Sequence, residues 1–542
     1  MPTSTGKYAT PGKDVEPKAD AMRTETVASE EAEQIPETAK PWHRTPLGRV
    51  CLVGGAGTAG TLVIASSAPV WHKAAPSWRL TLPGIPHPGP PVVAFLLFLL
   101  GAGLLSAAWI GLVGLSRDAS RSEAGRIRIV VAMLALWTVP ILLGPPLLSN
   151  DVYSYAAQGE LASQGVDPTS TGPVALERGE FLRAADPVWR RAAAPYGPVA
   201  IASSEAVVTA TGHDAAGAVW GFRVVMLVGI ALAAIGIPVI ARSFGTDPAL
   251  ALALGLANPL VLLHLIGGIH NDALMLGLLV CGIAAARRDR RVLAIVLVAL
   301  ATAVKLPAAC GFVFLGWDWA GSQQSTARRL LGAAVVSAIG MTIVAVLCVV
   351  VGIGFGWVTA LSNTGKVTST LAPATLLGLI SGDMVRSIGV ELGASTLVAL
   401  FRLAGLAVAG FVCLQILLRS DRIGMVRALG LSMLVVIAFG PVIWPWYLPV
   451  GLALLAAGGV GRYRPAVTVV VVATSFLVWP TSVGLLSDLT SYRDVLGLVV
   501  VVLIAGAAYL AQHVAATRGD DTELLDPESL THLPPQVEPA TA

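Results

Sequence analysis

Long apolar stretches recur through most of this 542-residue chain, and they restrict its possible folds more than any other feature. Hydrophobic residues make up 55% of the sequence, whereas charged residues make up only 13%, against about 25% in a soluble globular protein. A stretch of about 20 apolar residues can cross a bilayer as a helix. Because a segment in lipid must satisfy its own backbone hydrogen bonds, the sequence predicts an all-α, polytopic bundle of transmembrane helices.

Lysine and arginine residues near the ends of these stretches fix the predicted orientation, because they accumulate on the cytoplasmic side. Arg49 and the clusters at 117–128 and 287–291 all face the cytoplasm if both chain ends lie inside. This path requires about fourteen spans, one of them ending at the break Lys305-Leu306-Pro307. The expected spans lie near 48–68, 92–115, 129–148, 219–241, 248–266, 272–286, 291–304, up to 320, 331–355, 394–418, 427–443, 446–461, 465–486 and 494–514.

The chain divides into three predicted regions. Residues 1–46 and 516–542 are polar and poor in aromatic residues, which is typical of disordered tails, and the predicted orientation makes them cytoplasmic. Residues 47–515 form the transmembrane domain. Within it, 149–216 is predicted to be an extracytoplasmic loop with interfacial helices. The apolar segment Val199–Thr211 is assigned to this loop, because it is short and contains Glu205.

Cysteine and glycine motifs do not indicate a metal or cofactor site. The spacing of the five cysteines, all in apolar stretches, fits neither a disulfide framework nor a zinc site. Residues 55–60 match GxGxxG, but a dinucleotide site would need a preceding strand. Inside an apolar span, the small residues favour close helix packing instead. No metal and no cofactor are therefore predicted.

Asp151 is the main candidate for catalysis, because it opens the predicted outer loop directly after the third span. If a helix begins there, Tyr155 and Gln158 lie on the same face as the carboxylate. A carboxylate flanked by a hydroxyl and an amide is suited to deprotonate and orient an alcohol. The alternative is a helix-capping role, which Asn and Asp commonly take.

Further polar residues fall on the same predicted outer face. His270, Asn271 and Asp272 lie in a tight connection, where they either hold a phosphate or sugar hydroxyl or form a turn and helix cap. Lys305 either contacts a phosphate or extends toward the interface.

Arg402, like Lys305, is a candidate for binding the substrate phosphate, because it lies inside an apolar span, where a charge is costly and usually partnered. Trp444, Trp446 and Tyr447 are typical of an aromatic belt at a membrane interface. Stacking on a sugar or a lipid chain is the alternative interpretation of these three residues.

Five short strings indicate a relationship to a known family. They are residues 150–159 (NDVYSYAAQG), 186–189 (DPVW), 194–198 (APYGP), 270–275 (HNDALM) and 304–307 (VKLP). With these strings, the chain resembles, over about residues 48–515, the polyprenol-phosphate-mannose-dependent α-(1→6)-mannosyltransferases of actinobacteria, in the glycosyltransferase C superfamily.

The resemblance implies an inverting, metal-independent transfer of mannose from a polyprenyl-phosphate donor to the 6-hydroxyl of the mannan backbone of lipomannan and lipoarabinomannan. In this interpretation, Asp151 accepts the proton, and Lys305 and His270 lie near the donor phosphate. The implied partners are the lipid-linked donor, a mannan glycolipid and membrane lipid, without nucleic acid. The implied location is the plasma membrane, with the site on the extracytoplasmic side.

Two alternatives remain open at this point. A flippase or other transporter of lipid-linked sugars would have ionisable residues near the bilayer midplane in both halves and broken helices in matching positions. An oligosaccharide ligase of the same superfamily would share the lipid-linked donor but transfer a preassembled glycan.

Overall fold

A computed structural model describes residues 43, 45–70, 91–364, 369, 371–389, 393–478 and 506. In this part of the chain the secondary structure consists of helices, and no β-strand is found there. The expected tails, apart from residues 43, 45 and 46, lie outside the described residues. The same holds for the expected span near 494–514, apart from residue 506, and for the end of the span near 465–486.

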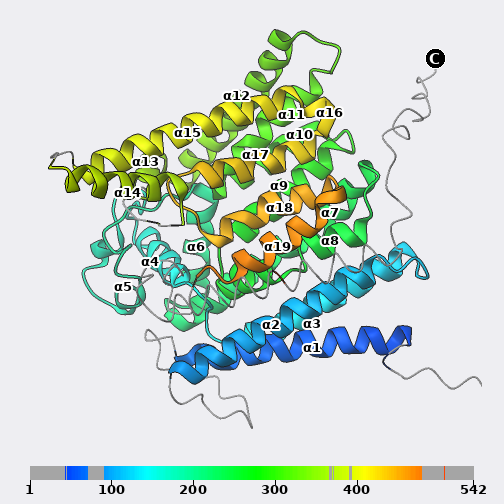
Figure 1. Cartoon of the computed structure of the whole chain (residues 1–542). Helices are drawn as coiled ribbons and strands as arrows, with labels where there is room; N and C mark the ends of the chain where they lie inside the picture. Colours follow the sequence, from blue (N-terminus) through cyan, green and yellow to red (C-terminus); the bar gives the residue numbers. More distant parts are fainter. Residues whose placement is uncertain are drawn as a thin grey trace, which may run out of the picture.

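The first three helices, α1 (Pro46–Ser67), α2 (Pro91–Ser116) and α3 (Glu123–Leu143), pack side by side along one face of the molecule (Figure 1). Small residues allow their close approach. A Cβ atom on Gly60 would lie 2.7 Å from the carbonyl oxygen of Gly101, and one on Gly57 would collide with the Trp137 ring. The prediction that the glycine motif at 55–60 serves helix packing is therefore confirmed.

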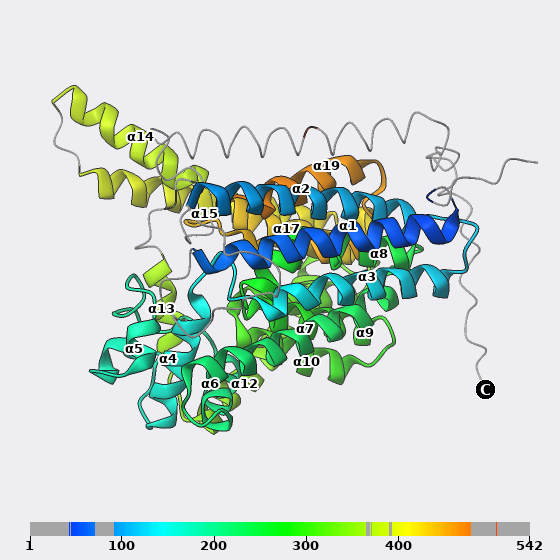
Figure 2. The ribbon, with the colours of Figure 1, turned by 90° about the horizontal axis from the view of Figure 1, so that it is seen from below.

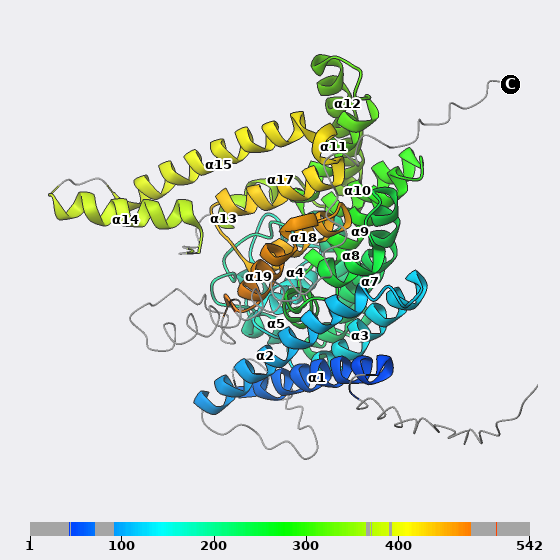
Figure 3. The same cartoon turned by 45° about the vertical axis from the view of Figure 1, so that its right-hand side comes forward.

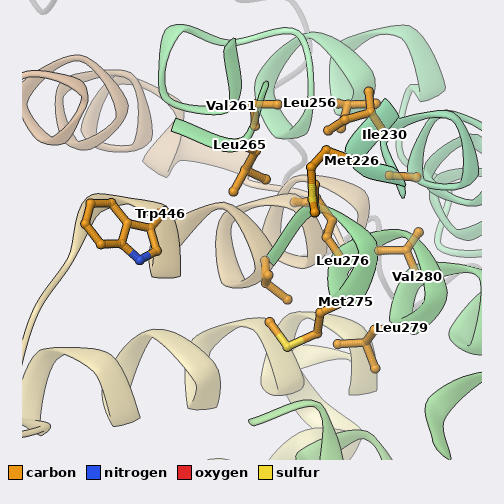
Figure 4. Packing of buried hydrophobic residues seen from close by; sticks show 14 of the residues in the cluster. Met226, Ile230, Leu256, Val261, Leu265, Met275, Leu276, Leu279, Val280 and Trp446 are labelled. Atoms are coloured by element: carbon orange, nitrogen blue, oxygen red, sulfur yellow. The ribbon is translucent and has the colours of Figure 1, made fainter. Parts of the chain in front are cut away.

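The centre of the bundle is formed by the next group of helices. These are α7 (Ala215–Ser243), α8 (Pro248–Gly255), the π-helical segment η4 (Val261–Gly267), α9 (Asp272–Ala286), α10 (Arg291–Val304), α11 (Cys310–Trp319) and α12 (Thr326–Val351). Figure 4 shows part of their buried core, in which Met226 and Ile230 of α7 lie near Leu276 and Val280 of α9. This close-packed core fixes the ends of the helices on which the polar residues lie.

The remaining helices extend along the other side of the core. They are α13 (Gly356–Thr364), α14 (Pro373–Ser387), α15 (Ala394–Leu418), α16 (Ser420–Ile423), α17 (Met425–Phe439), α18 (Leu448–Ala457) and α19 (Arg464–Ser475). Helix α14 and the adjoining end of α15 project away from the rest of the bundle (Figure 3). Neither α13 nor α14 was expected from the sequence.

Six described helices, α1, α2, α3, α7, α12 and α15, are long and apolar enough to cross a membrane. A seventh crossing is possible if η4 and α9, which meet at an angle of 109°, form one broken span. Several other expected spans are shorter helices or are interrupted, so the prediction of about fourteen spans is not confirmed. The expected span at 248–266, for example, breaks after α8, where the Asn258 side chain bonds both Leu254 O and Val261 N.

The predicted loop at 149–216 contains α4 (Asp151–Ser163), η3 (Pro173–Leu176), α5 (Glu180–Ala184) and α6 (Pro198–Ala210). Helix α6 includes most of the segment assigned to the loop, and with 13 residues it is not among the candidate crossings. Figure 2 shows α4, α5 and α6 gathered at one end of the long helices. This end of the bundle carries the candidate site.

Candidate functional site

A cavity of about 680 Å³ lies beside the first turns of α4. Its polar end is lined by Asp151, Ser154, Gln158, Asp272 and Lys305. These residues come from α4, from the start of α9 and from the break between α10 and α11. The structure thus brings four of the residues proposed from the sequence to one surface, and adds Ser154, which the sequence analysis did not select.

The backbone before α4 places Asp151 at the start of the helix. Leu148 has a positive φ of 60°, and the Ser149 hydroxyl accepts a hydrogen bond from the Asp151 backbone N–H at 3.1 Å. The helix-capping position is held by Asn150, whose side chain makes no capping hydrogen bond. The Asp151 carboxylate faces the cavity, and its side chain is 18% exposed. The geometry therefore favours a functional carboxylate over a cap.

Burial sets the protonation behaviour of Asp151. Loss of water raises the pKa of its carboxyl from 3.8 to about 6, and the negative charges of Asp186 and Asp272 act in the same direction. The Lys305 ammonium and a hydrogen bond from Trp189 oppose this rise. A carboxylate with a pKa near neutral is a better proton acceptor than an ordinary aspartate, and it is still ionised at pH 7.

His270 lies behind Asp151 and does not line the cavity. Its side chain is fully buried, with Nδ1 3.6 Å from Asp151 Oδ2 and 3.5 Å from the Tyr155 hydroxyl. The ring stacks on Trp446 with 4.0 Å between centroids. The sequence analysis expected His270 near a donor phosphate, whereas the structure directs it toward the carboxylate.

Lys305 and Asp272 form a buried ion pair. Lys305 Nζ lies 3.0 Å and 2.8 Å from the two carboxylate oxygens, and the side chains are 13% and 1% exposed. The Tyr447 ring lies 4.4 Å from the ammonium. Asp272, considered from the sequence as a ligand for sugar or phosphate, is therefore engaged with Lys305.

The remaining candidates on α4 and α9 differ in their access to the cavity. Gln158 lines it, and its Oε1 has no hydrogen-bond partner among the described residues. Tyr155 instead packs edge-on against Tyr196, with 5.3 Å between centroids. Asn271 is buried, does not line the cavity, and makes no capping bond with its side chain. Gln158 is thus the member of this group best placed to bind a ligand.

Arg402 lies outside the cluster. Its Nε donates to the Thr375 hydroxyl at 2.8 Å, and that hydroxyl donates to the Pro441 carbonyl at 2.7 Å. Arg402 is not among the residues that line the cavity. The structure therefore supports a role in joining α15 to α14 and to the end of α17 more than a role in binding substrate.

Aromatic residues form much of the wall beside the polar end. Trp189, Trp444, Trp446 and Tyr447 all line the cavity, and Trp444 stacks on Trp446 at 4.9 Å. The sequence analysis favoured a membrane-interface belt for the last three. Trp189 was noted from the sequence only as part of the string at 186–189. No feature of the sequence indicated that it lies beside Asp151.

The loop wall that carries Tyr196 is fixed to the end of α10. The Gly197 N–H donates to the Val304 carbonyl at 3.3 Å. A Cβ atom at Gly197 would lie only 2.4 Å from the Ala303 carbonyl oxygen. Glycine at this position therefore lets the loop approach α10 directly beside Lys305.

Away from the polar end, the cavity is lined mostly by apolar residues. Its wall is formed by residues at the start of α11, in the middle of α15 and at the end of α17, namely Ala309, Cys310, Leu406, Met433 and Ile437. Among the described residues, no group of three or more His, Cys, Asp or Glu side chains is arranged to hold a metal ion. The cavity thus combines a charged end with an extended apolar part, which suits an amphipathic ligand.

Two models of known families match the chain. The family model described as "Alpha-(1->6)-mannopyranosyltransferase, N-terminal domain" matches residues 48–321. A second model, "MptB C-terminal domain", matches residues 374–511. The first match includes Asp151, His270, Asp272 and Lys305.

Curated relatives carry the same family name. An alpha-(1->6)-mannopyranosyltransferase A of Mycobacterium tuberculosis is 34% identical over 374 residues, which cover 67% of this chain and 71% of the relative. Another alpha-(1->6)-mannopyranosyltransferase of that organism is 30% identical over 496 residues, covering 80% and 82%. A third, from Corynebacterium glutamicum, is 28% identical over 421 residues, covering 74% and 83%.

No solved structure matches the chain. The two family models together span both sides of the cavity, and the identity to curated relatives extends over most of the chain. The chain therefore belongs to the alpha-(1→6)-mannopyranosyltransferase family.

Proposed function

We propose that this protein transfers mannose from polyprenyl-phosphate mannose to the 6-hydroxyl of an α-(1→6)-mannan chain on a glycolipid, with inversion at the transferred carbon. The observation that carries this proposal is the cavity itself. Asp151 and Lys305 share its polar end, and an apolar wall continues from them. The names of the relatives support the mannosyl transfer and the linkage.

In the proposed reaction the acceptor O6 attacks C1 of mannose while the bond from C1 to the phosphate oxygen breaks. Asp151 takes the proton from the acceptor hydroxyl, and the phosphate leaves with the bonding electron pair. A double displacement would need a second carboxylate as nucleophile. Asp272 is poorly suited to that role, because it is almost fully buried and both of its oxygens bond Lys305. This supports the proposal of a single displacement, and hence inversion.

Lys305 is the proposed partner of the departing phosphate. An ammonium has three N–H donors, and in this structure it makes two hydrogen bonds to Asp272. A remaining donor can face the cavity, which Lys305 also lines. A donor that is already fixed in place stabilises developing negative charge without reorganising during the reaction.

The apolar part of the cavity is the proposed site of the polyprenyl chain. Ala309 and Cys310 of the α10–α11 region face Leu406 of α15 and Ile437 of α17 across it. Burying each methylene group of a lipid contributes about 0.8 kcal/mol. This wall therefore favours a lipid-linked donor over a nucleotide sugar.

The site is proposed to face the extracytoplasmic side of the plasma membrane, with both chain ends in the cytoplasm. Arg126, Arg242 and Arg329 lie on the predicted cytoplasmic side and Asp151 on the other, which agrees with the usual charge bias. After the five native cysteines have been replaced, a Glu177→Cys variant, changed at an exposed residue of the loop, should react in whole cells with a membrane-impermeant maleimide. Reaction only after the cells are opened would reverse this orientation.

The proposed base is tested by Asp151→Asn. Purified protein is given labelled polyprenyl-phosphate mannose and a short α-(1→6)-mannoside, and we expect transfer to fall by roughly 10²- to 10⁴-fold, the usual contribution of a general base. Asp186→Asn is the matched control. Asp186 lies close enough to influence Asp151, but its oxygen accepts the Val188 N–H, which an asparagine can also do. Full activity of the Asp151 variant would rule out its role as base.

The lipid site is tested by Leu406→Trp. We expect the KM for the long-chain donor to rise about tenfold, the effect of losing contact with roughly two methylene groups. Leu403→Trp is the control, because Leu403 is an exposed residue of the same helix that does not line the cavity. Equal donor KM values for the two variants would place the lipid elsewhere.

A further inference from the structure

We propose that His270 is a positioning residue for Asp151, donating its Nδ1–H to the carboxylate and holding it in the orientation that accepts the acceptor proton. The inference depends on the proposed role of Asp151 as base. It assigns His270 an effect on the rate of proton transfer and no contact with the donor. This differs from the phosphate contact that the sequence suggested.

The contact geometry supports this role. His270 Nδ1 lies 3.6 Å from Asp151 Oδ2, slightly longer than a hydrogen bond. Catalytic hydrogen bonds are often long in the absence of substrate and shorten when it binds. Because the imidazole is fully buried and does not line the cavity, it can affect the reaction only through its neighbours.

The proposed contact with Asp151 requires the proton to lie on Nδ1, whereas the Tyr155 hydroxyl, 3.5 Å from the same nitrogen, suits either tautomer. An ionised carboxylate only accepts hydrogen bonds, so Nδ1 must be protonated for a favourable contact with Asp151. In the neutral ring, Nε2 is then the acceptor. Nε2 has no partner among the described residues. A buried acceptor without a partner is tolerated more often than a buried N–H without one. The tautomer with its proton on Nδ1 is therefore also the better one for the environment of Nε2.

The plane of the imidazole is held by an aromatic stack. Trp446 lies against it at 4.0 Å and 12°, and Trp444 lies against Trp446 at 4.9 Å and 7°. The Gly268 backbone also lies close to the edge of the ring, since a Cβ atom built there would be only 3.0 Å from Nε2. The ring therefore has little freedom to turn away from Asp151.

The turns that precede Asp151 and His270 have strained backbone angles and are joined by a hydrogen bond. Leu148, three residues before Asp151, and Ile269, directly before His270, have φ values of 60° and 56°. Such angles are unfavourable for residues other than glycine, and they persist where surrounding structure determines them. Between the two turns, Leu147 N–H donates to the Gly267 carbonyl at 2.8 Å. Both residues are thus set relative to one another by the same pair of turns.

The inference is tested with His270→Phe and His270→Asn in the full-length purified protein, using labelled donor and acceptor. Phenylalanine keeps a flat ring against Trp446 but removes the N–H group that would bond Asp151. We expect kcat to fall about 10- to 100-fold, the value of a hydrogen bond to a charged group, with the donor KM unchanged. An asparagine side chain can place an N–H near the position of Nδ1, so this variant should recover part of the lost rate.

The pH profile separates positioning from a general loss of structure. Losing a donor to the carboxylate disfavours its ionised form, so the acid limb of kcat in His270→Phe should move to higher pH. The other groups that face Asp151 are Lys305, Asp186, Asp272, Trp189 and the buried hydroxyls of Tyr155, Tyr196 and Tyr447. All of them remain in the variants.

Three outcomes would overturn the inference. The first is an unchanged kcat and pH profile in His270→Phe. The second is a raised KM for the sugar donor with an unchanged kcat, which would indicate that His270 helps to bind the sugar donor. The third concerns His270→Gln, which places its amide nitrogen near Nε2 instead: it should be slower than His270→Asn, and an equal or higher rate contradicts a donor at Nδ1.

The base itself is tested separately in the same assay. An inactive Asp151→Asn variant beside an unaffected His270→Phe variant would remove only this inference. An active Asp151→Asn variant would remove the proposed base and, with it, the reason for a positioning residue.

Discussion

Charged side chains meet near the surface at the end of the bundle where α3 begins, whereas at the end near Asp151 they are buried. Arg242 and Glu123 form a pair at 2.8 Å with half-exposed side chains, and in the pair of Arg329 with Asp421 the carboxylate is exposed although the arginine is only 6% exposed. About 30 Å away along α3, Lys305 and Asp272 are almost enclosed and Asp151 lies against a fully buried His270.

The comparison shows which charges are explained by structure alone. Exposed ion pairs contribute little to stability, and those at the start of α3 suit a surface in contact with water and lipid headgroups. Buried charges cost free energy that a hydrophobic replacement would avoid. Their retention beside a cavity, together with strained turns and unpartnered polar atoms, indicates a site that was selected for chemistry.

The largest expected effect comes from breaking the buried pair. Lys305→Ala leaves Asp272 charged and almost fully enclosed, which should destabilise the protein by about 3–5 kcal/mol. The double variant Lys305→Met with Asp272→Leu should regain much of this stability while remaining inactive. Thermal unfolding in detergent, measured beside the labelled-donor assay, gives both results. A Lys305→Ala protein as stable as the wild type would show that the pair is solvated.

A second prediction uses the pH dependence of kcat/KM. Asp151 acts as a base only when ionised, so activity should be maximal above its pKa of about 6 and fall about tenfold per pH unit below it. Asp186→Asn removes a negative charge that raises this pKa, so its acid limb should move to lower pH. If the acid limb of kcat/KM does not move in this variant, Asp186 has no influence on the pKa of Asp151.

The smallest effect is expected at the opposite end. Arg242→Ala breaks the pair with Glu123, and we expect a change of less than about 1 kcal/mol in stability because both side chains are half exposed. Transfer activity in the labelled-donor assay should stay within about twofold of wild type, since a residue at this end lies about 30 Å from the cavity. A larger loss of either quantity would contradict the contrast between the two ends.

The sequence predicted the features that depend on local pattern. Apolar content predicted a helical membrane protein. The position of Asp151 after the third span predicted that it begins a helix, with Gln158 on the same face. The five strings predicted the family. These features are encoded within one or two helical turns, where spacing alone determines the arrangement.

The direction of the buried side chains could not be read from the sequence. Lys305 and Asp272 are 33 residues apart, and His270 and Tyr155 are 115 apart, so their contacts depend on how helices pack. The predicted number of spans was not confirmed for a related reason. Ile269 has a φ that its side chain disfavours, so local preference gave no sign of the bend between η4 and α9.

Gly197 has a consequence for how this scaffold can change. Any side chain at this position would clash with the Ala303 carbonyl. The segment that carries Tyr196 therefore keeps a fixed position relative to Lys305, and we expect natural variants to retain glycine at position 197. The exposed loop residues Arg178 and Glu180 carry no such restriction, whereas their neighbours Glu177 and Gly179 have positive φ values of 55° and 114°. Sequence change in this loop is therefore expected to concentrate at such exposed positions and to spare the wall beside Lys305.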